Sequence, residues 1–265
     1  MASRLADLLK GYRSNFRFAN RFQVLYDRIF RRHLPLTHYV LKNGLVFICS
    51  SRLGDHIAIQ ECFCEHVYDR FLDRCQFPAN RIAYVNIGAH IGAFDLMLAE
   101  RGLIIEKGLA VELNPQTFAK CVVNLQANGF WSVKAVNAGI GENDRLIRFN
   151  PSGLSIGDGI FSQSEAGEAV EVQLLTLATL LERHAGNFPR FDLLKLDCER
   201  AEYAILRTSA PGLLRKFRYL IIEFHPPPKG ESVETAYSKL KDAGFVPLEN
   251  RRSDTDFVDL FTRAD

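Results

Sequence analysis

The sequence lacks the features that would place a chain across a membrane. It has no long hydrophobic run, and its mean hydropathy of -0.06 leaves no room for a protein that crosses a bilayer several times. Arg4 and Asp7 interrupt the start of the chain, where a secretory signal needs an unbroken apolar stretch. We therefore expect no export signal and a cytoplasmic location.

Internal repeats and zinc-binding cysteine patterns are also missing. The six cysteines contain no C-x-x-C pair, and the spacing of Cys62 and Cys64 fits no common zinc module. We expect buried free thiols and predict no metal site. The chain does contain 47% hydrophobic and 24% charged residues over a length of 265, which predicts a folded globular protein.

Positive charge is concentrated at the start of the chain. Residues 1–35 carry eight basic side chains against two acidic ones, although the whole chain has a net charge of only +2. The helical spacing of the apolar residues predicts a basic helical extension over residues 1–37. Such a segment could make peripheral contact with an anionic surface, although a solvated helical face has the same pattern. We expect no specific nucleic-acid partner.

The rest of the chain divides into two parts. Residues 38–80 predict a β-hairpin that turns at Asn43-Gly44, followed by a helix that Asp55 caps. In residues 81–265, short apolar strands alternate with amphipathic helices, which is typical of an α/β fold with a mostly parallel sheet. The last two strands are close enough in sequence to form an antiparallel hairpin. The strands that we expect cover residues 82–87, 108–113, 132–137, 145–149, 170–174, 191–197, 219–224, 245–248 and 257–261.

The clearest functional signal is a strand that runs into a glycine-containing turn and then a helix, with the sequence V-N-I-G-A-H-I-G at residues 85–92. Glycine lets the backbone approach a ligand, and open α/β sheets bind ligands at the carboxyl ends of their strands. The pattern predicts a nucleotide-like cofactor, although its G-x-x-x-G spacing differs from the G-x-G-x-x-G of dinucleotide sites. The candidate binding residues in this loop are Asn86, Gly88, Ala89, His90 and Gly92.

Three further candidates lie near the ends of the next two strands. Glu112 ends the second strand, at the distance expected for a carboxylate that accepts hydrogen bonds from both ribose hydroxyls. Asn114 follows as a helix N-cap, and Asn137 ends the third strand, where it could reach an adenine edge. A surface glutamate before a helix and an asparagine in a turn would give the same pattern.

Polar pairs also end the fourth and fifth strands. Lys195 and Asp197 share one face of a strand that we expect to be buried, so each needs a partner or a function. Glu199 follows at the start of a helix, where an acid also favours the helix dipole. Glu223 and His225 repeat the arrangement, and a histidine with an ordinary pKa of about 6.5 could take a proton from a hydroxyl. An acid and a histidine could equally bind a divalent metal, but this spacing is not diagnostic.

These motifs, in their order along the chain, resemble those of the FkbM family of S-adenosylmethionine-dependent methyltransferases. The family's V-D-I-G-A-N-I-G loop corresponds to residues 85–92, and its carboxylate strand corresponds to residues 111–115. Its K-x-D-x-E-G-x-E stretch corresponds to residues 195–202, and its E-x-H motif corresponds to residues 223–225. Asn124 and Asn128 resemble the family's second-helix pattern, and the resemblance covers roughly residues 54–225.

The resemblance implies a Rossmann-like class I methyltransferase that uses S-adenosylmethionine as its cofactor. It also implies transfer of a methyl group to a hydroxyl of a sugar, a glycolipid or another small metabolite. In that reaction Asp197 and His225 are the candidates for the base or the residue that orients it, with Lys195, Glu199 and Glu223 in support.

Three residues depart from the family pattern: Asn86 replaces an aspartate, His90 an asparagine and Arg200 a glycine. The departures favour one alternative, a catalytically weak cofactor-binding module. A second alternative is a nicotinamide-dependent oxidoreductase on a similar sheet, which the glycine spacing disfavours.

Overall fold

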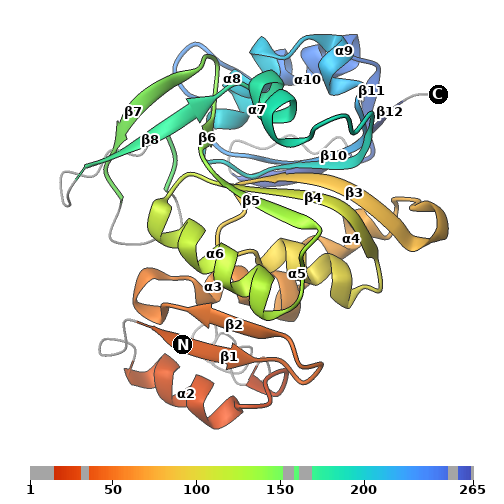
Figure 1. Ribbon diagram of the computed structural model, residues 1–265. Coiled ribbons are helices and arrows are strands. Elements are labelled where there is room, and N and C mark those ends of the chain that lie inside the picture. The colour runs from red at the N-terminus through yellow and green to blue at the C-terminus, as the bar shows by residue number, and fades with distance from the viewer. Residues whose placement is uncertain (1–14, 31–35, 152–157, 161–168, 250–255, 264–265) are drawn as a thin grey trace, which may run out of the picture.

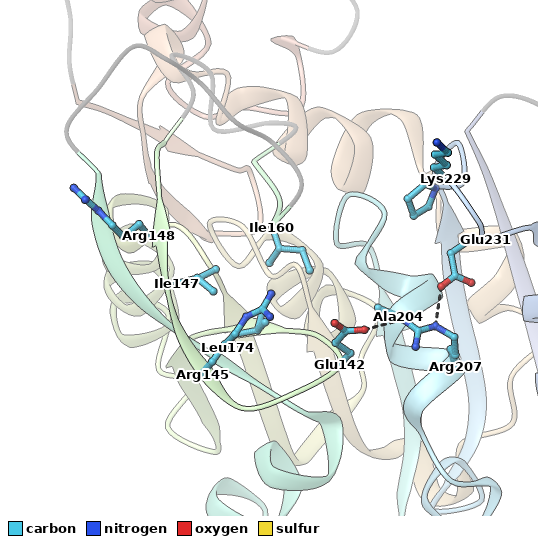
Figure 2. Close-up of a pocket in the computed structure, with 11 residues that line it drawn as sticks. Glu142, Arg145, Ile147, Arg148, Ile160, Leu174, Ala204, Arg207, Lys229 and Glu231 are labelled. Carbon is cyan, nitrogen blue, oxygen red and sulfur yellow. Dashed lines mark hydrogen bonds and ion pairs between the residues drawn. The ribbon is translucent and has the colours of Figure 1, made fainter.

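A seven-stranded sheet forms the centre of the computed structural model, which describes residues 15–30, 36–151, 158–160, 169–249 and 256–263 (Figure 1). The strand order is β11-β12-β10-β9-β3-β4-β5, and β12 runs antiparallel to both of its neighbours. This order confirms the expected α/β class, with a mostly parallel sheet and an antiparallel end. The strands are β3 (Arg81–Ile87), β4 (Ile104–Glu112), β5 (Val133–Asn137), β9 (Phe191–Leu196), β10 (Phe217–Phe224), β11 (Phe245–Pro247) and β12 (Phe257–Arg263).

Helices cover both faces of this sheet, which explains why its inner strands are apolar almost throughout. On one face α5 (Ala93–Glu100) and α6 (Pro115–Ala127) pack against alternate residues such as Tyr84 and Leu193. The opposite face packs Val85 and Leu194 against the second set of helices. These helices are α7 (Leu177–His184), α8 (Ala201–Thr208), α9 (Pro211–Leu214) and α10 (Val233–Asp242).

The expected hairpin is present as β1 (Thr37–Val40) and β2 (Val46–Cys49), which pair antiparallel across a turn at Gly44 with φ 92°. Two asparagines of α6 attach the hairpin to the core. Asn124 Oδ1 accepts a hydrogen bond from the Ile48 nitrogen at 2.6 Å, and Asn128 Oδ1 accepts one from the Val46 nitrogen at 2.9 Å. The hairpin is therefore fixed to the same helix that follows β4.

The outer side of the hairpin carries α2 (Arg21–Phe30), the described part of the expected basic extension. Val24 is fully buried, and the buried Asp27 accepts a hydrogen bond from the Tyr39 hydroxyl at 2.7 Å. Residues 1–14 and 31–35, which include several of the basic side chains, lie outside the described residues. Among the helices that the structure describes, none combines the length and the apolar character that crossing a bilayer requires.

The prediction of a single helix after Asp55 is wrong in part. The chain forms α3 (His56–Gln60), a π-helical turn (Glu61–Glu65) and α4 (Asp69–Leu72), with His66 in the left-handed region at φ 56°. Asp55 does not cap α3, because its Oδ2 accepts a hydrogen bond from the Ser50 nitrogen at 2.6 Å and pairs with Lys120. The break places Glu61 and Tyr68 beside the central sheet.

A second, smaller sheet projects from the far end of the core. It has the order β6-β8-β7 and consists of β6 (Gly139–Ile140), β7 (Arg145–Phe149) and β8 (Val170–Leu175), so the two extra strands expected here are confirmed. Of the segment between β7 and β8, the structure describes residues 150–151, 158–160 and 169. Short 3₁₀ turns at Ser51–Leu53 and Pro78–Asn80 complete the elements.

Candidate active site

The carboxyl ends of β3, β4, β9 and β10 meet at one edge of the sheet, where they enclose a cavity of about 130 Å³. Parallel neighbours in the order β10-β9-β3-β4 bring these strand ends together from distant parts of the sequence. The cavity is lined by Ala58, Glu61, Gly88, His90, Glu112, Asp158, Asp197, Glu199, Glu223 and His225. Seven of these residues are among the candidates that the sequence predicts.

The glycine loop is packed tightly between the ends of two neighbouring strands. The Gly88 nitrogen donates a hydrogen bond to Val111 O of β4 at 3.0 Å, and the Asp197 nitrogen after β9 donates one to Ile87 O at 3.0 Å. Gly88 has φ 82°, and a Cβ at this position would lie 1.6 Å from the carbonyl oxygen of Asp197. Only glycine fits, so Gly88 determines how closely the loop approaches β9.

Glu112 closes the other side of the loop. Its Oε2 accepts a hydrogen bond from the His90 nitrogen and its Oε1 accepts one from the Asn114 nitrogen, both at 2.8 Å. Burial raises the pKa of Glu112 to about 7, against the lowering effect of these two backbone donors. Each carboxylate oxygen keeps a second lone pair for a ligand in the cavity.

Asn86 lies beneath the loop and does not line the cavity. It is fully buried, and its Nδ2 donates a hydrogen bond to Asp95 Oδ2 at 2.8 Å. Asp95 also accepts a hydrogen bond from the Tyr84 hydroxyl at 2.7 Å, and burial raises its pKa. Asn86 Oδ1 is buried without a hydrogen-bond partner among the described atoms. It is therefore an acceptor that a ligand donor would satisfy.

The two asparagines predicted at strand ends have different roles. Asn114 caps α6 by accepting a hydrogen bond from the Gln116 nitrogen at 2.9 Å, and its Nδ2 donates one to Asp158 Oδ2 at 2.7 Å. Asn137 donates from Nδ2 to the carbonyl oxygens of Glu112 and Leu113. Asn137 thus ties β5 to the end of β4 and does not line the cavity.

Lys195 and Asp197 are each other's partner, which explains two charged residues on one buried strand face. Lys195 Nζ donates to Asp197 Oδ2 at 2.8 Å. Burial alone would raise the pKa of Asp197, but the charge and hydrogen bond of Lys195 lower it below its usual value. The Tyr68 hydroxyl lies 3.4 Å from both Asp197 Oδ2 and Glu223 Oε2. The repulsion of Asp197, followed by burial, raises the pKa of Glu223 to about 8.

His225 is held on both sides by acids of the segment after β9. Its Nδ1 lies 3.1 Å from Oε1 of the fully buried Glu202, and its Nε2 lies 3.5 Å from Glu199 Oε2. Burial disfavours the imidazolium, but the hydrogen bond and charge of Glu202 prevail and raise the pKa of His225 to about 9. Arg200 is exposed and does not line the cavity, so its charge lies apart from this group.

His90 belongs to a network that the sequence does not reveal. Its Nε2 lies 3.7 Å from Oδ1 of the fully buried Asp55, whose Oδ2 pairs with Lys120 of α6. Burial lowers the pKa of His90 to about 4, so its ring is neutral at physiological pH. The family's asparagine is thus replaced here by a neutral imidazole that connects the glycine loop to α3 and α6.

Sequence reasoning missed three residues at the site, namely Glu61, Tyr68 and Asp158. Glu61 lies in the π-helical turn, and burial followed by the charge of Asp197 raises its pKa to about 7. Tyr68 and Asp158 reach the site from segments with no strand-end position. No periodicity or motif distinguishes these residues, because their placement depends on how α3, α4 and the segment after β7 fold.

Comparisons with known proteins agree with the motifs. The family model of the methyltransferase FkbM domain matches residues 86–247. Among curated proteins, none matches this sequence. The methyltransferase FkbM from Methylobacillus flagellatus KT has 14% sequence identity and a TM-score of 0.47, over 69% of this chain and 44% of that chain. This chain therefore spans less than half of that relative.

Two further solved structures are similar to parts of the chain. TrmK from M. capricolum, in complex with S-adenosyl-homocysteine, has 9% identity and a TM-score of 0.44, over 74% of this chain and 66% of that chain. The N-terminal domain of EvdMO1 with the same product bound has 14% identity and a TM-score of 0.42, over 78% and 81% of the two chains. The family model matches more than half of the present chain. The protein therefore belongs to the FkbM methyltransferase domain family, a class of enzymes whose cofactor is S-adenosylmethionine.

Proposed function

We propose that the protein transfers a methyl group from S-adenosylmethionine to a hydroxyl oxygen of a sugar, a glycolipid or another small metabolite. The observation that carries the proposal is the meeting of Glu112, Asp197 and His225 around one cavity at the strand ends. Glu112 lines the cavity, and each of its oxygens keeps a lone pair that a ribose hydroxyl can use. Asp197 can accept the hydroxyl proton, and His225, which is protonated below its pKa of about 9, can orient the acceptor.

The charge of the cavity suits this cofactor. Six carboxyl groups line it, from Glu61, Glu112, Asp158, Asp197, Glu199 and Glu223, and a cation favours the ionised form of those whose pKa is raised. S-adenosylmethionine carries a positive sulfonium and a positive ammonium group, which such a wall attracts. Asn86 Oδ1, buried without a hydrogen-bond partner among the described atoms, offers a further acceptor close to the loop. We assign cofactor binding to the loop at Gly88 and to Glu112.

The cofactor, when bound, supplies an electrophilic methyl group: the new C–O bond forms as the C–S bond breaks, and the electron pair of that bond stays on sulfur. The protein has to align the acceptor oxygen with this methyl group and receive the hydroxyl proton. The contacts of Asp197 with Lys195 and Tyr68 both use Oδ2, so Oδ1 remains for the hydroxyl. His225 borders the same position, with Glu199 and Glu223 beside it.

Methyl transfer from labelled S-adenosylmethionine to a panel of cell glycans and glycolipids tests the proposal. Asp197→Asn and His225→Ala should each lower turnover by at least about a hundredfold, the lower range for a general base, while cofactor binding persists. Glu231→Gln is the matched control, because Glu231 pairs with Arg207 away from this cavity. Near-normal turnover of both site variants at saturating cofactor would contradict the assignment.

The same assays distinguish the two alternative functions, a nicotinamide-dependent oxidoreductase and a cofactor-binding module. Binding of NADH without binding of S-adenosylmethionine would favour an oxidoreductase over a methyltransferase. Tight cofactor binding without turnover on any acceptor would favour a cofactor-binding module.

We also propose that α2 contacts an anionic membrane surface, which would suit a glycolipid acceptor. Phe22, Tyr26 and Ile29 recur at helical spacing on its outer face with exposed fractions of 75%, 58% and 64%. The Arg21 guanidinium lies 5.1 Å from the centre of the Phe22 ring. Exposed apolar residues beside basic ones are typical of helices that lie in the membrane interface.

Vesicle sedimentation tests this contact. The protein should bind phosphatidylcholine vesicles that contain an anionic lipid more strongly than vesicles without it, and Phe22→Ser with Ile29→Ser should reduce the binding. Leu146→Ser is the control, since Leu146 is 67% exposed on the small sheet. Deletion of residues 1–35 is unsuitable because it would remove the buried Phe18 and Val24. Equal binding to both kinds of vesicle would contradict the proposal.

A further inference from the structure

We propose that Asp197, Glu223 and His225 bind a divalent cation of the Mn²⁺ class beside the position of the acceptor hydroxyl. Each residue offers one ligand atom, and these three atoms all lie within 4.8 Å of one another. Two carboxylates and an imidazole form a donor set that suits Mn²⁺ and its neighbours among the divalent metals. The proposed role at the acceptor rests on the proposed function, whereas the binding of the ion does not.

The separations suit a single ion. Ligands about 2.1 Å from an octahedral ion lie about 3.0 Å apart when adjacent and about 4.2 Å apart when opposite. The observed limit of 4.8 Å requires only small side-chain shifts to reach these values. The ligands come from the ends of two adjacent parallel strands, β9 and β10, so the main chain holds them together.

His225 is already oriented as a ligand. Oε1 of Glu202, on α8 and outside the three-residue group, lies 3.1 Å from Nδ1 and can accept its hydrogen, which leaves Nε2, 3.5 Å from Glu199 Oε2, to bind the ion. Histidines that bind metals commonly donate their second ring N–H to a carboxylate, which fixes the ring and strengthens the ligand. Glu202 is fully buried, so solvent does not compete for this bond.

The two carboxylates also keep oxygens free. Lys195 and Tyr68 contact Asp197 only at Oδ2, and Tyr68 contacts Glu223 only at Oε2. Lys195 is buried and does not line the cavity, and its ammonium lies 2.8 Å from Asp197 Oδ2. Glu223 Oε1 and one lone pair of Asp197 Oδ1 therefore remain for an ion, and the second lone pair of Asp197 Oδ1 remains for the acceptor hydroxyl.

The charge of the cavity leaves room for a second cation beside the cofactor. Six carboxyl groups line the wall, and a bound cation favours the ionised form of Glu61, Glu112 and Glu223, whose pKa values are raised. S-adenosylmethionine with an ionised carboxylate brings a net charge of only about +1. Glu112 lies at the end of β4 and the proposed ion site at the ends of β9 and β10, with β3 between them in the sheet. An ion at this site would bind the acceptor oxygen and lower the pKa of its hydroxyl, which makes proton removal easier.

Manganese binding to the full chain, freed of metal by a chelator and kept without cofactor, tests the inference directly. Electron paramagnetic resonance and calorimetry should detect one Mn²⁺ per chain. Glu223→Gln and His225→Ala should each weaken binding by at least about tenfold, whereas Glu231→Gln should leave it unchanged. Glu223→Gln keeps the side-chain shape, so it remains informative if His225→Ala fails to fold.

The outcomes separate the ion site from the proposed function. If the wild type binds no Mn²⁺, or if Glu223→Gln binds it as tightly as the wild type, the ion site is overturned while cofactor binding still stands. Mn²⁺ binding that depends on Glu223, in a chain that binds no S-adenosylmethionine, would support the ion site and overturn the proposed function. Loss of methyl transfer with chelator and its recovery with Mn²⁺ would support both.

Discussion

One carboxylate oxygen of Glu202 accepts hydrogen bonds from both the backbone nitrogen and the ring Nδ1 of His225, at 2.9 and 3.1 Å. The first turn of α8 thus fixes the end of β10 and the orientation of its histidine together. The Tyr203 hydroxyl adds a third link by donating to His225 O at 2.7 Å. The acid and the histidine come from separate motifs of the sequence, and the fold joins them.

Glu202→Ala should therefore lower kcat by about a hundredfold, because a displacement of about 1 Å at a reacting group has an effect of this size. Glu202 is a positioning residue, so the Kd of S-adenosylmethionine should stay within a few fold. The loss of an acceptor for a buried backbone nitrogen should also lower stability by about 1–3 kcal/mol. Steady-state kinetics and denaturant unfolding measure the two effects.

Glu202→Gln is the conservative comparison. Its amide oxygen can still accept both hydrogen bonds, so this variant should recover much of the lost kcat. If Gln and Ala at position 202 reduce kcat equally, the orientation of His225 by this oxygen is not what the reaction needs.

Glu112→Ala should weaken binding of S-adenosylmethionine by about ten- to a hundredfold, since it removes charge-assisted hydrogen bonds worth about 1.5–3 kcal/mol. The side chain also bonds the nitrogens of His90 and Asn114, so the glycine loop loses support at the same time. Calorimetry gives the Kd, and circular dichroism checks that the variant is folded. An unchanged Kd would mean that the ribose is held elsewhere.

The affinity for S-adenosylmethionine should depend on pH through Glu112. Burial, together with the smaller effects of the charges of Asp158 and Asp197, raises the pKa of this group to about 7, although the two backbone donors act in the opposite direction. The ribose hydroxyls bind best to the ionised carboxylate, so the Kd should rise as the pH falls through 7. Below the pKa the change should approach about tenfold per pH unit for one proton.

Glu112→Gln provides the control for this titration, because it keeps the shape of the side chain without its proton equilibrium. The difference between the pH profiles of wild type and variant removes the titration of the cofactor's own amino group. Parallel profiles between pH 6 and 8 would show that Glu112 does not govern the affinity.

The strand-end residues could be predicted from sequence because parallel topology determines where strands end. Glu112, Asp197 and His225 each follow a short apolar strand, and such strands meet at one edge of the sheet. Glu61 and Asp158 could not be predicted, since a π-helical turn and an irregular segment carry them into the cavity. The pairing of Asp55 with Lys120 joins residues far apart in sequence, and no local pattern records it.

The expected helix after Asp55 illustrates the same limit. Its apolar stripe is real, as Ile59, Phe63 and Phe71 are all buried. The hydrogen bond from the Ser50 nitrogen and the pairing with Lys120 nevertheless draw the Asp55 carboxylate away from the cap position. Tertiary contacts therefore decided the geometry where local propensity predicted one continuous helix.

Arg200→Gly should stabilise the protein. Arg200 stands where the family has glycine, and its backbone adopts φ 76°, directly after Glu199 at φ 52°. The left-handed conformation costs about 1–2 kcal/mol for a residue with a Cβ and almost nothing for glycine. Glycine also has more conformational freedom in the unfolded chain, and this offsets up to about 1 kcal/mol of the stability gained by relieving the backbone. The side chain is exposed, and no described hydrogen bond or ion pair involves it.

For Arg200→Gly we expect the free energy of unfolding, measured with denaturant, to rise by about 0.5–1 kcal/mol. Lys239→Gly in α10, at a position that is also exposed but helical, should lose about 1 kcal/mol. A loss of stability at both positions would show that Arg200 has a structural role that outweighs the relief of its backbone.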